Sequence, residues 1–372
     1  MQRMLSTVDK HLLYNIGLNY FMKHVQMEAA NKRAKIAANK ENDENTRLGF
    51  DLAAPKDSQD EAEEGKETKY KDIIAFDGKV SKSSKREETD QTPGQKPLNT
   101  LNAYSVGLGS CLGQDFIPEK TNEITSMPIL LNNIEIEGAI ITCDALNTQT
   151  NIVKQIIERG ADYVMPIKEN KKTLYGDFQV FFDERVIEAM REEGGEESDG
   201  RQYLSSQSRE QGKKVVREYF LITKFDGLYQ AEAWVGLKAI GLARRTVFKV
   251  EPKTKEVTTT YEDRYYISSV DTIVQFAQAV RGHWCVENSL HWHLDYTFKD
   301  DSNKTTISKG AEGLQVIKKL ALTILKVLQA VSPLYTSIKN LRLGLCMLFE
   351  KKISILLNLF NPAVINKIKG VF

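Results

Sequence analysis

The sequence has 372 residues, which is enough for two domains or for one domain with a large insertion. Its 51 lysines and arginines balance 50 aspartates and glutamates, so overall charge indicates neither a nucleic-acid nor a membrane partner, and any DNA affinity must come from local patches. The four cysteines lie far apart, which favours buried reduced thiols over a metal site. No apolar signal segment and no run of about 18 apolar residues occurs, so we expect a cytoplasmic protein without a membrane partner.

Residues 1–71 form a charged amino-terminal region. A candidate amphipathic helix, Leu12–Val25, is followed by stretches rich in Lys, Glu, Asp and Gln with almost no large apolar side chain. Such stretches cannot bury enough apolar surface to offset the entropy of ordering the chain. We therefore predict a region that is partly disordered.

Residues 72–200 begin with a predicted antiparallel meander. The short apolar run Asp72–Lys79 predicts a buried strand that ends at an acid and a glycine, Asp77 and Gly78. Small and apolar residues alternate around three glycines in Leu101–Phe116, which predicts two more strands joined by a turn. Three consecutive strands of this kind favour an antiparallel arrangement.

Helices and strands then alternate along the chain. The apolar spacing predicts a helix over Asn122–Asn132, a strand over Gly138–Asp144, a helix over Thr148–Arg159 and a strand over Tyr163–Ile167. A strand, a helix and a strand in this order imply a parallel pair with a crossover. The sheet is therefore predicted to be mixed.

The rest of the chain divides into three predicted parts. A helix over Leu174–Arg191 precedes a β-rich segment, residues 201–269, whose β-branched and aromatic residues favour strands. Its predicted strands are Val215–Thr223, Ala231–Leu237, Thr246–Val250 and Val257–Ile267. Residues 270–330 return to helical spacing, strongest over Leu314–Leu328, and residues 331–372 are predicted to be an apolar carboxyl-terminal helical region.

A helix predicted over residues 281–295 carries an unusual set of side chains. Its apolar side is predicted to consist of Val280, Trp284, Leu290 and Leu294. Its other side carries His283, Glu287 and His291, each four residues after the last. Three interpretations remain open: Glu287 helps to hold a divalent metal while Trp284 and Trp292 anchor the helix, all three polar residues bind one zinc ion, or they form a solvated stripe.

Two aspartates, Asp77 and Asp144, end strongly apolar predicted strands. If those strands are neighbours and the helix with Glu287 packs against them, the three carboxylates converge. They would repel one another unless cations lie between them. Two magnesium ions about 3.5–4 Å apart, held in this way, serve phosphodiester cleavage or transfer.

Five stretches together resemble the H-repeat-associated insertion-sequence transposases of the DDE superfamily. These stretches are Ile74–Lys79, Glu119–Ile124, Gly138–Ala145, Gly160–Val164 and His283–Trp292. Their order and spacing match over about residues 72–330. The resemblance implies an α/β fold in which a ribonuclease H-like mixed sheet, flanked by helices, is the catalytic core, formed by residues 72–200 and 270–330. It also implies that residues 201–269 are an insertion between the second and third catalytic acids.

The resemblance also implies a reaction and its residues. Asp77, Asp144 and Glu287 would be the catalytic and metal-binding triad for two Mg²⁺ or Mn²⁺ ions, and His283 and Asn288 would be accessory residues. The expected activity is cleavage of double-stranded DNA at element ends and strand transfer into target DNA, by a homodimer on DNA in a bacterial nucleoid. A truncated remnant that only binds DNA is the alternative, because residues 1–70 do not resemble the family's largely helical amino-terminal region.

Local positive charge is expected to contact DNA phosphates. The residues expected to do so are Lys79, Lys168, Lys171, Lys172, Arg244 and Arg245, with Lys304, Lys318 and Lys319 as a further group. Ordinary solvated surface is the competing interpretation for each residue taken alone. Only a shared face would make these residues a binding site.

Overall fold

The computed structural model describes residues 71–89, 94–118, 121–194, 199–250, 257–302, 305 and 308–331. The predictions for residues 1–70, for residues 332–372 and for Lys304 lie outside these ranges. No helix among the described residues is long and apolar enough to cross a membrane.

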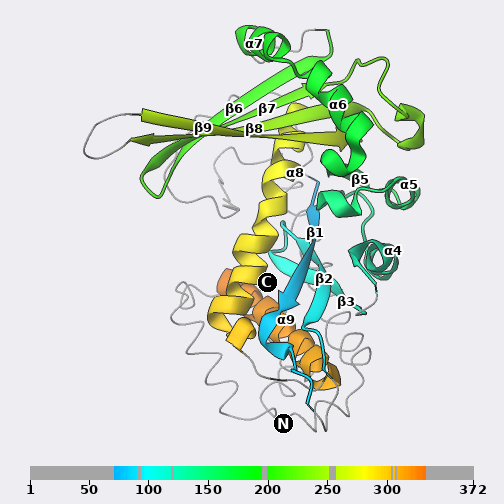
Figure 1. The fold of residues 1–372 in the computed structure, drawn as a ribbon, viewed down its shortest axis with the longest axis vertical. Helices are drawn as coiled ribbons and strands as arrows, with labels where there is room; N and C mark the ends of the chain where they lie inside the picture. The colour runs from blue at the N-terminus through cyan, green and yellow to red at the C-terminus, as the bar shows by residue number, and fades with distance from the viewer. Residues whose placement is uncertain are drawn as a thin grey trace, which may run out of the picture.

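Nine strands of the described chain form one sheet, in the order β3-β2-β1-β4-β5-β9-β8-β7-β6 (Figure 1). The strands are β1 Ile73–Ser81, β2 Leu98–Ser105, β3 Ser110–Ile117, β4 Ile140–Cys143, β5 Asp162–Ile167, β6 Arg201–Glu210, β7 Lys213–Ile222, β8 Ala239–Val250 and β9 Val257–Ser268. Strands β1 to β3 pair antiparallel, whereas β4 pairs parallel with both β1 and β5. The predicted meander and the predicted mixed sheet are both confirmed.

Strands β6 to β9 continue the same sheet, because β9 pairs antiparallel with β5. The long hairpin of β8 and β9 reaches away from the rest of the molecule (Figure 1). The strand predicted over Ala231–Leu237 is wrong: a 3-10 turn at Ala231–Ala233 lies there, flanked by Gln230 and Gly236 with positive φ angles. Strand β6, in contrast, was not predicted, since it is polar and only partly buried.

Six α-helices are present among the described residues. They are α4 Glu123–Asn133, α5 Thr150–Glu158, α6 Lys172–Phe181, α7 Glu184–Glu192, α8 Ile273–Cys285 and α9 Ser308–Val331. The prediction of a single helix over Leu174–Arg191 is wrong, because two helices, α6 and α7, lie there with a short non-helical segment between them. The Asp183 side chain accepts a hydrogen bond from the Val186 N–H and starts α7 as a new helix.

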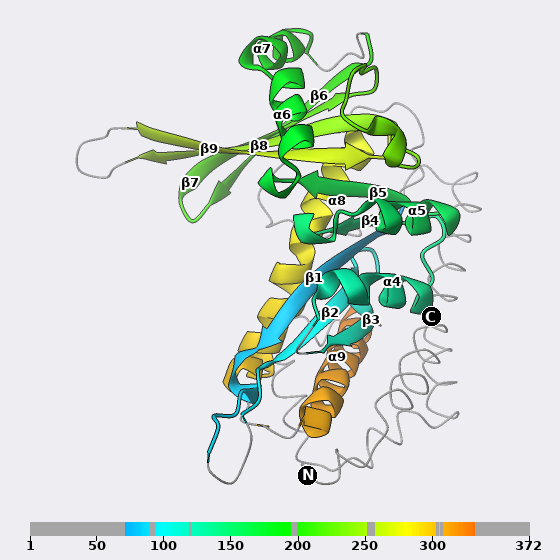
Figure 2. The same cartoon turned by 45° about the vertical axis from the view of Figure 1, so that its right-hand side comes forward.

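Both faces of the sheet are buried at β1, and the alternating side chains of this strand show it. Ile74 and Phe76 belong to the apolar cluster that α4 and α5 complete, whereas Ile73 and Ala75 belong to the cluster that α8 completes. Successive residues of a strand point to opposite faces, so a strand covered on both sides reads as a continuous apolar run. Figure 2 shows α8 on one side of the sheet, with α4 and α5 on the other.

Helix α8 approaches β1 closely at Gly282. A Cβ atom added to Gly282 would lie 2.9 Å from Cγ2 of Ile73. The absence of a side chain therefore sets the distance between the helix and the strand at this crossing, and this crossing positions the residues that follow α8.

The substitution Gly282→Ala is expected to destabilise the protein relative to Gly176→Ala by about 1–3 kcal/mol. Both changes remove a helical glycine and gain the same helix propensity, but a Cβ atom at Gly176 would meet nothing within 4 Å. The difference between the two variants, measured by urea unfolding, therefore isolates the clash with Ile73. Equal stability of the two variants would contradict the close crossing.

Candidate active site

Asp77 and Asp144 lie side by side where two parallel strands part. The pairing of β1 with β4 ends at Phe76 and Cys143, and the two aspartates are the next residues of each strand. Asp77 alternates with Ile73 and Ala75, so the period of the strand directs it to the face that α8 covers. The Asp144 carboxylate accepts a hydrogen bond of 2.7 Å from the Ala145 N–H and caps the turn that follows.

Glu287 lies on a π-helical segment, Val286–His291, that continues α8. Val286 and Leu290 are fully buried and anchor this segment on the sheet, whereas Glu287 itself is exposed. A π-helical turn widens a helix locally and changes which side chains share a face, and such turns are frequent at functional sites. The segment therefore carries Glu287 over the end of β1.

The electrostatics of Asp77 show which carboxylates surround it. Burial, followed by the negative charges of Glu123, Glu287 and Asp144, raises the pKa of Asp77 to about 7, and a hydrogen bond from the Gly78 N–H opposes this rise. A carboxyl with three acidic neighbours is costly to ionise without a cation. Asp144 and Glu287, both predicted, thus lie within electrostatic range of Asp77, together with a fourth acid.

That fourth acid, Glu123, was not predicted as a site residue. It is the first residue of α4, and its carboxylate accepts a hydrogen bond of 3.0 Å from the Asn147 side chain. Burial, followed by the charge of Asp144, raises the pKa of Glu123, and the Asn147 hydrogen bond opposes this. The only signal in the sequence was its place inside the family motif Glu119–Ile124, since nothing in the spacing relates it to Asp77.

Two histidines border the carboxylates in their neutral form. His291 Nδ1 lies 3.5 Å from Asp77 Oδ2, but burial lowers the pKa of His291 to about 3, so this contact is not an ion pair at neutral pH. Burial likewise lowers the pKa of His283 to about 4. Within the described part of the chain, His291 Nε2 and His283 Nδ1 are buried without a hydrogen-bond partner. Each nitrogen could serve a bound group.

The three catalytic candidates are near one another but not tightly packed. Among the described residues, only Asp295, Asp300 and Asp301 form a trio of potential ligands whose ligand atoms all lie within 4.8 Å of one another. Asp77, Asp144 and Glu287 do not form such a trio. The zinc interpretation of His283, Glu287 and His291 gains no support, because these residues do not form such a trio either.

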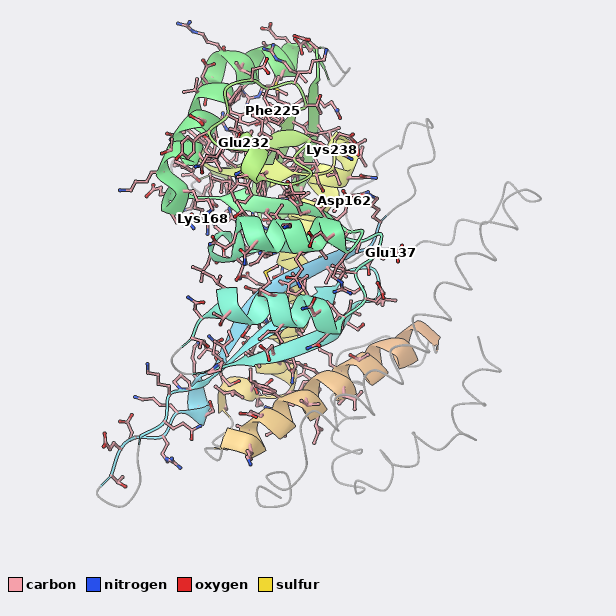
Figure 3. The ribbon with its side chains drawn as sticks, turned by 90° about the vertical axis from the view of Figure 1, so that its right-hand side faces the viewer. Glu137, Asp162, Lys168, Phe225, Glu232 and Lys238 are labelled. Atoms are coloured by element: carbon pink, nitrogen blue, oxygen red, sulfur yellow. The ribbon has the colours of Figure 1, made fainter. Side chains whose placement is uncertain are left out.

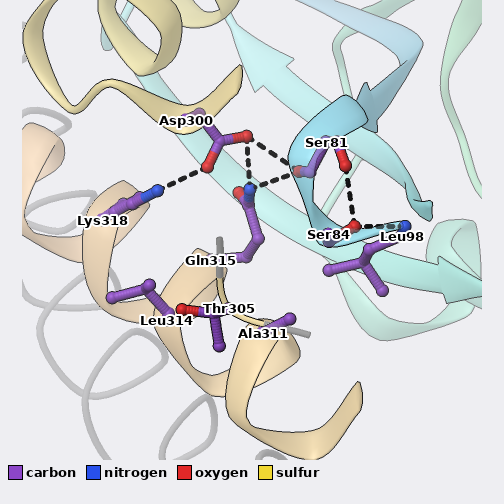
Figure 4. Close-up of a pocket in the computed structure, with 9 residues that line it drawn as sticks. All are labelled: Ser81, Ser84, Leu98, Asp300, Thr305, Ala311, Leu314, Gln315 and Lys318. Atoms are coloured by element: carbon purple, nitrogen blue, oxygen red, sulfur yellow. Dashed lines mark hydrogen bonds and ion pairs between the residues drawn. The ribbon is translucent and has the colours of Figure 1, made fainter. Parts of the chain in front are cut away.

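Asp295, Asp300 and Asp301 each form a salt bridge with a lysine. The ion pairs are Lys79–Asp295 at 2.6 Å, Lys82–Asp301 at 3.2 Å and Lys318–Asp300. Ser81 and Gln315 also donate hydrogen bonds to Asp300, beside a small pocket (Figure 4). These contacts already neutralise the carboxylates and tie the end of β1 to α9.

The lysines that follow β5 are at the surface near the acids. Lys168 has 62% of its side chain exposed, and its Nζ lies 3.3 Å from Asp144 Oδ1. Lys172 is also exposed, and Lys171 places its Nζ over the Trp234 ring. Figure 3 shows Lys168 at the opposite end of β5 from Asp162. This end of the strand therefore presents positive charge beside Asp144.

Other cations expected to contact DNA have different surroundings. Arg244 is buried and paired with Glu184 and Asp263. Lys79, Lys318 and Lys319 are also buried, so the structure does not support phosphate contacts by any of these four residues. Arg245 is partly exposed but lies 2.8 Å from Glu210.

The tryptophans near Glu287 point outward. Trp284 is 40% exposed with the Arg264 guanidinium 4.5 Å above its ring, and Trp292 is 41% exposed and stacks on Tyr296 at 4.7 Å. The prediction that Trp284 faces the core is therefore wrong. The buried side of the helix runs instead from Val280 through Val286 to Leu290 and Leu294. Asn288 is exposed beside Glu287.

The raised pKa of Asp77 predicts that metal-free protein loses stability as pH rises. Between about pH 4 and pH 7 the folded state holds a proton at Asp77 that the unfolded state has released, so unfolding becomes easier through this window. Asp77→Asn removes the effect and should stabilise the protein at pH 8 by up to about 4 kcal/mol, with little change at pH 4. Urea unfolding in the presence of a chelator measures both values, and equal stabilisation at both pH values would contradict the assignment.

Comparisons with known proteins identify relatives of this chain. Two relatives from Escherichia coli (strain K12), "Putative protein YbfL" and "H repeat-associated putative transposase YhhI", are each 34% identical over 259 residues, or 68% of this chain and 64% of theirs. The chain thus spans less than two thirds of the length of these relatives.

A solved piggyBac transposase synaptic complex with hairpin DNA is 12% identical with a TM-score of 0.38, covering 74% of this chain and 51% of that one. Residues 69–324 match the family model described as the transposase DDE domain. The chain therefore belongs to the transposase family that is defined by this domain, with H repeat-associated proteins among its relatives.

Proposed function

We propose that this protein is the transposase of a bacterial insertion sequence, which cleaves DNA at the element ends and transfers the strands to target DNA. The observation that carries the proposal is that Asp144 and Glu287 lie within electrostatic range of Asp77, at the point where the parallel strands β1 and β4 part. The family match supports the reaction class, and the bacterial relatives support the source. The family resemblance also supports a homodimer assembled on the DNA.

The strand order supports a ribonuclease H-like core within the proposal. Three antiparallel strands, β1 to β3, are followed by two parallel strands, β4 and β5, with the first two acids at the ends of β1 and β4. Strands β6 to β9 and their loops come between Asp144 and Glu287 in the sequence. We accordingly infer that residues 201–269 are an insertion in the core, although they extend the same sheet.

The site suits divalent cations with a preference for oxygen ligands. Asp77, Asp144 and Glu287 would hold two Mg²⁺ or Mn²⁺ ions, because hard cations prefer carboxylates and because burial, followed by the charges of the neighbouring acids, makes the ionised form of Asp77 costly, a cost that a bound cation would offset. When bound, such ions activate the attacking oxygen and stabilise the leaving oxygen of a phosphodiester. The buried unpaired nitrogens of His283 and His291 provide further polar contacts at the border of the site.

The protein's own side chains would bind and orient the DNA. Lys168 lies beside Asp144, where it can hold a phosphate next to the carboxylates, and Lys172 extends the same positive surface. Trp284 and Trp292 offer exposed rings on either side of Glu287 in the sequence, and Arg264 adds a cation above Trp284. Phosphate contacts and ring contacts of this kind position DNA without reading its sequence.

Asp144→Asn is expected to reduce Mg²⁺- or Mn²⁺-dependent cleavage of DNA by at least about 100-fold, since a lost metal contact removes several kcal/mol of transition-state stabilisation. Asparagine can still cap the turn at Ala145, so folding and DNA binding should be retained. The matched control is Asp226→Asn, an exposed aspartate on the loop between β7 and β8. Unchanged cleavage by Asp144→Asn would contradict the proposal, and joined donor and target products would separate a transposase from a simple nuclease.

The double substitution Lys168→Ala with Lys172→Ala is expected to weaken DNA binding and to reduce the slope of log affinity against log salt by about 2, because each lost phosphate contact contributes about one unit. Fluorescence anisotropy over a range of salt concentrations measures this slope. Lys224→Ala is the control, since this exposed lysine pairs with Asp199 beside the outer strands β6 and β7. A slope that does not change would exclude these lysines from the DNA surface.

A further inference from the structure

Glu123 reaches Asp77 from the opposite face of the sheet to Glu287. Asp77 shares the face of α8, whereas the next residue, Gly78, shares the face of α4, because successive strand residues alternate. A Cβ atom on Gly78 would lie 2.0 Å from Oε1 of Glu123. The Glu123 carboxylate therefore occupies the space that any other side chain would fill at this position of β1.

A buried amide holds Glu123 in that space. Asn147 is fully buried, and its Nδ2 donates a hydrogen bond of 3.0 Å to Oε2 of Glu123. Asn147 belongs to the turn that Asp144 caps, so Glu123 is tied directly to the segment that carries the second acid. One carboxylate oxygen of Glu123 is thus fixed by Asn147, and the other lies against the backbone beside Asp77.

Three buried polar atoms on residues of the candidate site have no hydrogen-bond partner within the described part of the chain. They are Oδ1 of Asn147, Nδ1 of His283 and Nε2 of His291. Buried polar groups are nearly always hydrogen-bonded, so the unpaired Oδ1 of Asn147, on the side chain that holds Glu123, indicates that something further binds beside it. Among the charged neighbours of Asp77, Glu123 has the largest effect on it, ahead of Glu287 and Asp144.

We propose that Glu123 is a fourth carboxylate of the divalent-cation site, which binds a cation directly through the gap that Gly78 leaves in β1. This inference rests on the proposed function and deepens it. The cation site then has acids from both faces of the sheet, with Glu287 on one face, Glu123 on the other and the two aspartates between them. Gly78 and Asn147 are positioning residues, because they act through Glu123.

The test measures Mn²⁺ binding by electron paramagnetic resonance, with the full chain and a short DNA duplex. Glu123→Gln keeps an oxygen that can accept the Asn147 hydrogen bond but loses the charge, whereas Glu123→Ala loses both. A cation ligand predicts that both variants weaken Mn²⁺ binding by at least about 10-fold. Near-normal binding by Glu123→Gln together with weak binding by Glu123→Ala would overturn the proposal and leave Glu123 with a structural role only.

Gly78→Ala provides an independent arm, because the added Cβ atom forces the Glu123 carboxylate away while leaving every acid in the chain. It should weaken Mn²⁺ binding as Glu123→Ala does, and the double variant should be no worse than either single one. Fully additive losses would also overturn the proposal. Glu137→Gln, an exposed glutamate beyond the far end of α4, is the matched control and should bind Mn²⁺ normally.

The same measurement separates this inference from the proposed function. Loss of Mn²⁺ binding in Asp144→Asn, with full binding in both Glu123 variants, would retain the triad and reject Glu123. Absence of Mn²⁺ binding by the unsubstituted protein would reject the cation site itself and both proposals with it.

Discussion

Repulsion between carboxylates is the constraint on which the candidate site depends. Burial of Asp77, followed by the negative charges of Glu123, Glu287 and Asp144, raises the pKa of Asp77, so the folded chain holds these carboxylates together at a cost. A strand buried on both faces can impose that cost, since its backbone is fixed by neighbours on each side. Stability given up at such a position is typical of sites that are organised for a ligand.

Three elements carry the acids, and each is fixed by a different kind of contact. The ladder between β1 and β4 places the two aspartates in register, the close crossing at Gly282 sets the height of α8 above β1, and the Asn147 hydrogen bond ties α4 to the turn after β4. These contacts are independent of one another. The geometry of the site is therefore a property of the whole core and not of any one loop.

The sequence predicted the parts of the site that depend on local pattern. The strands before Asp77 and Asp144 are apolar runs closed by an acid, and the helix before Glu287 has clear helical spacing, so these elements and the mixed sheet could be recognised. The outward position of Trp284 could not, because Gly282 and Val286, and not Trp284, lie on the buried side of the helix between Val280 and Leu290. Glu123 could not be assigned either, since it approaches β1 only in the folded protein, where its carboxylate occupies the space left by the absent side chain of Gly78. Arg244 looked like a surface cation only because its partners, Glu184 and Asp263, are distant in sequence.

The continuity of the sheet bears on how far this chain can be shortened. Helix α8 packs not only on β1 and β4 but also on β6, β7 and β8, and its Phe276 contacts the rings of Tyr219 on β7 and Tyr266 on β9. Removal of residues 201–269 would delete the two tyrosine rings, expose Phe276 of α8 and turn β5 into an open edge with unpaired backbone groups. A trimmed catalytic fragment would then be prone to aggregate, so the β6–β9 strands belong to the smallest unit that can fold.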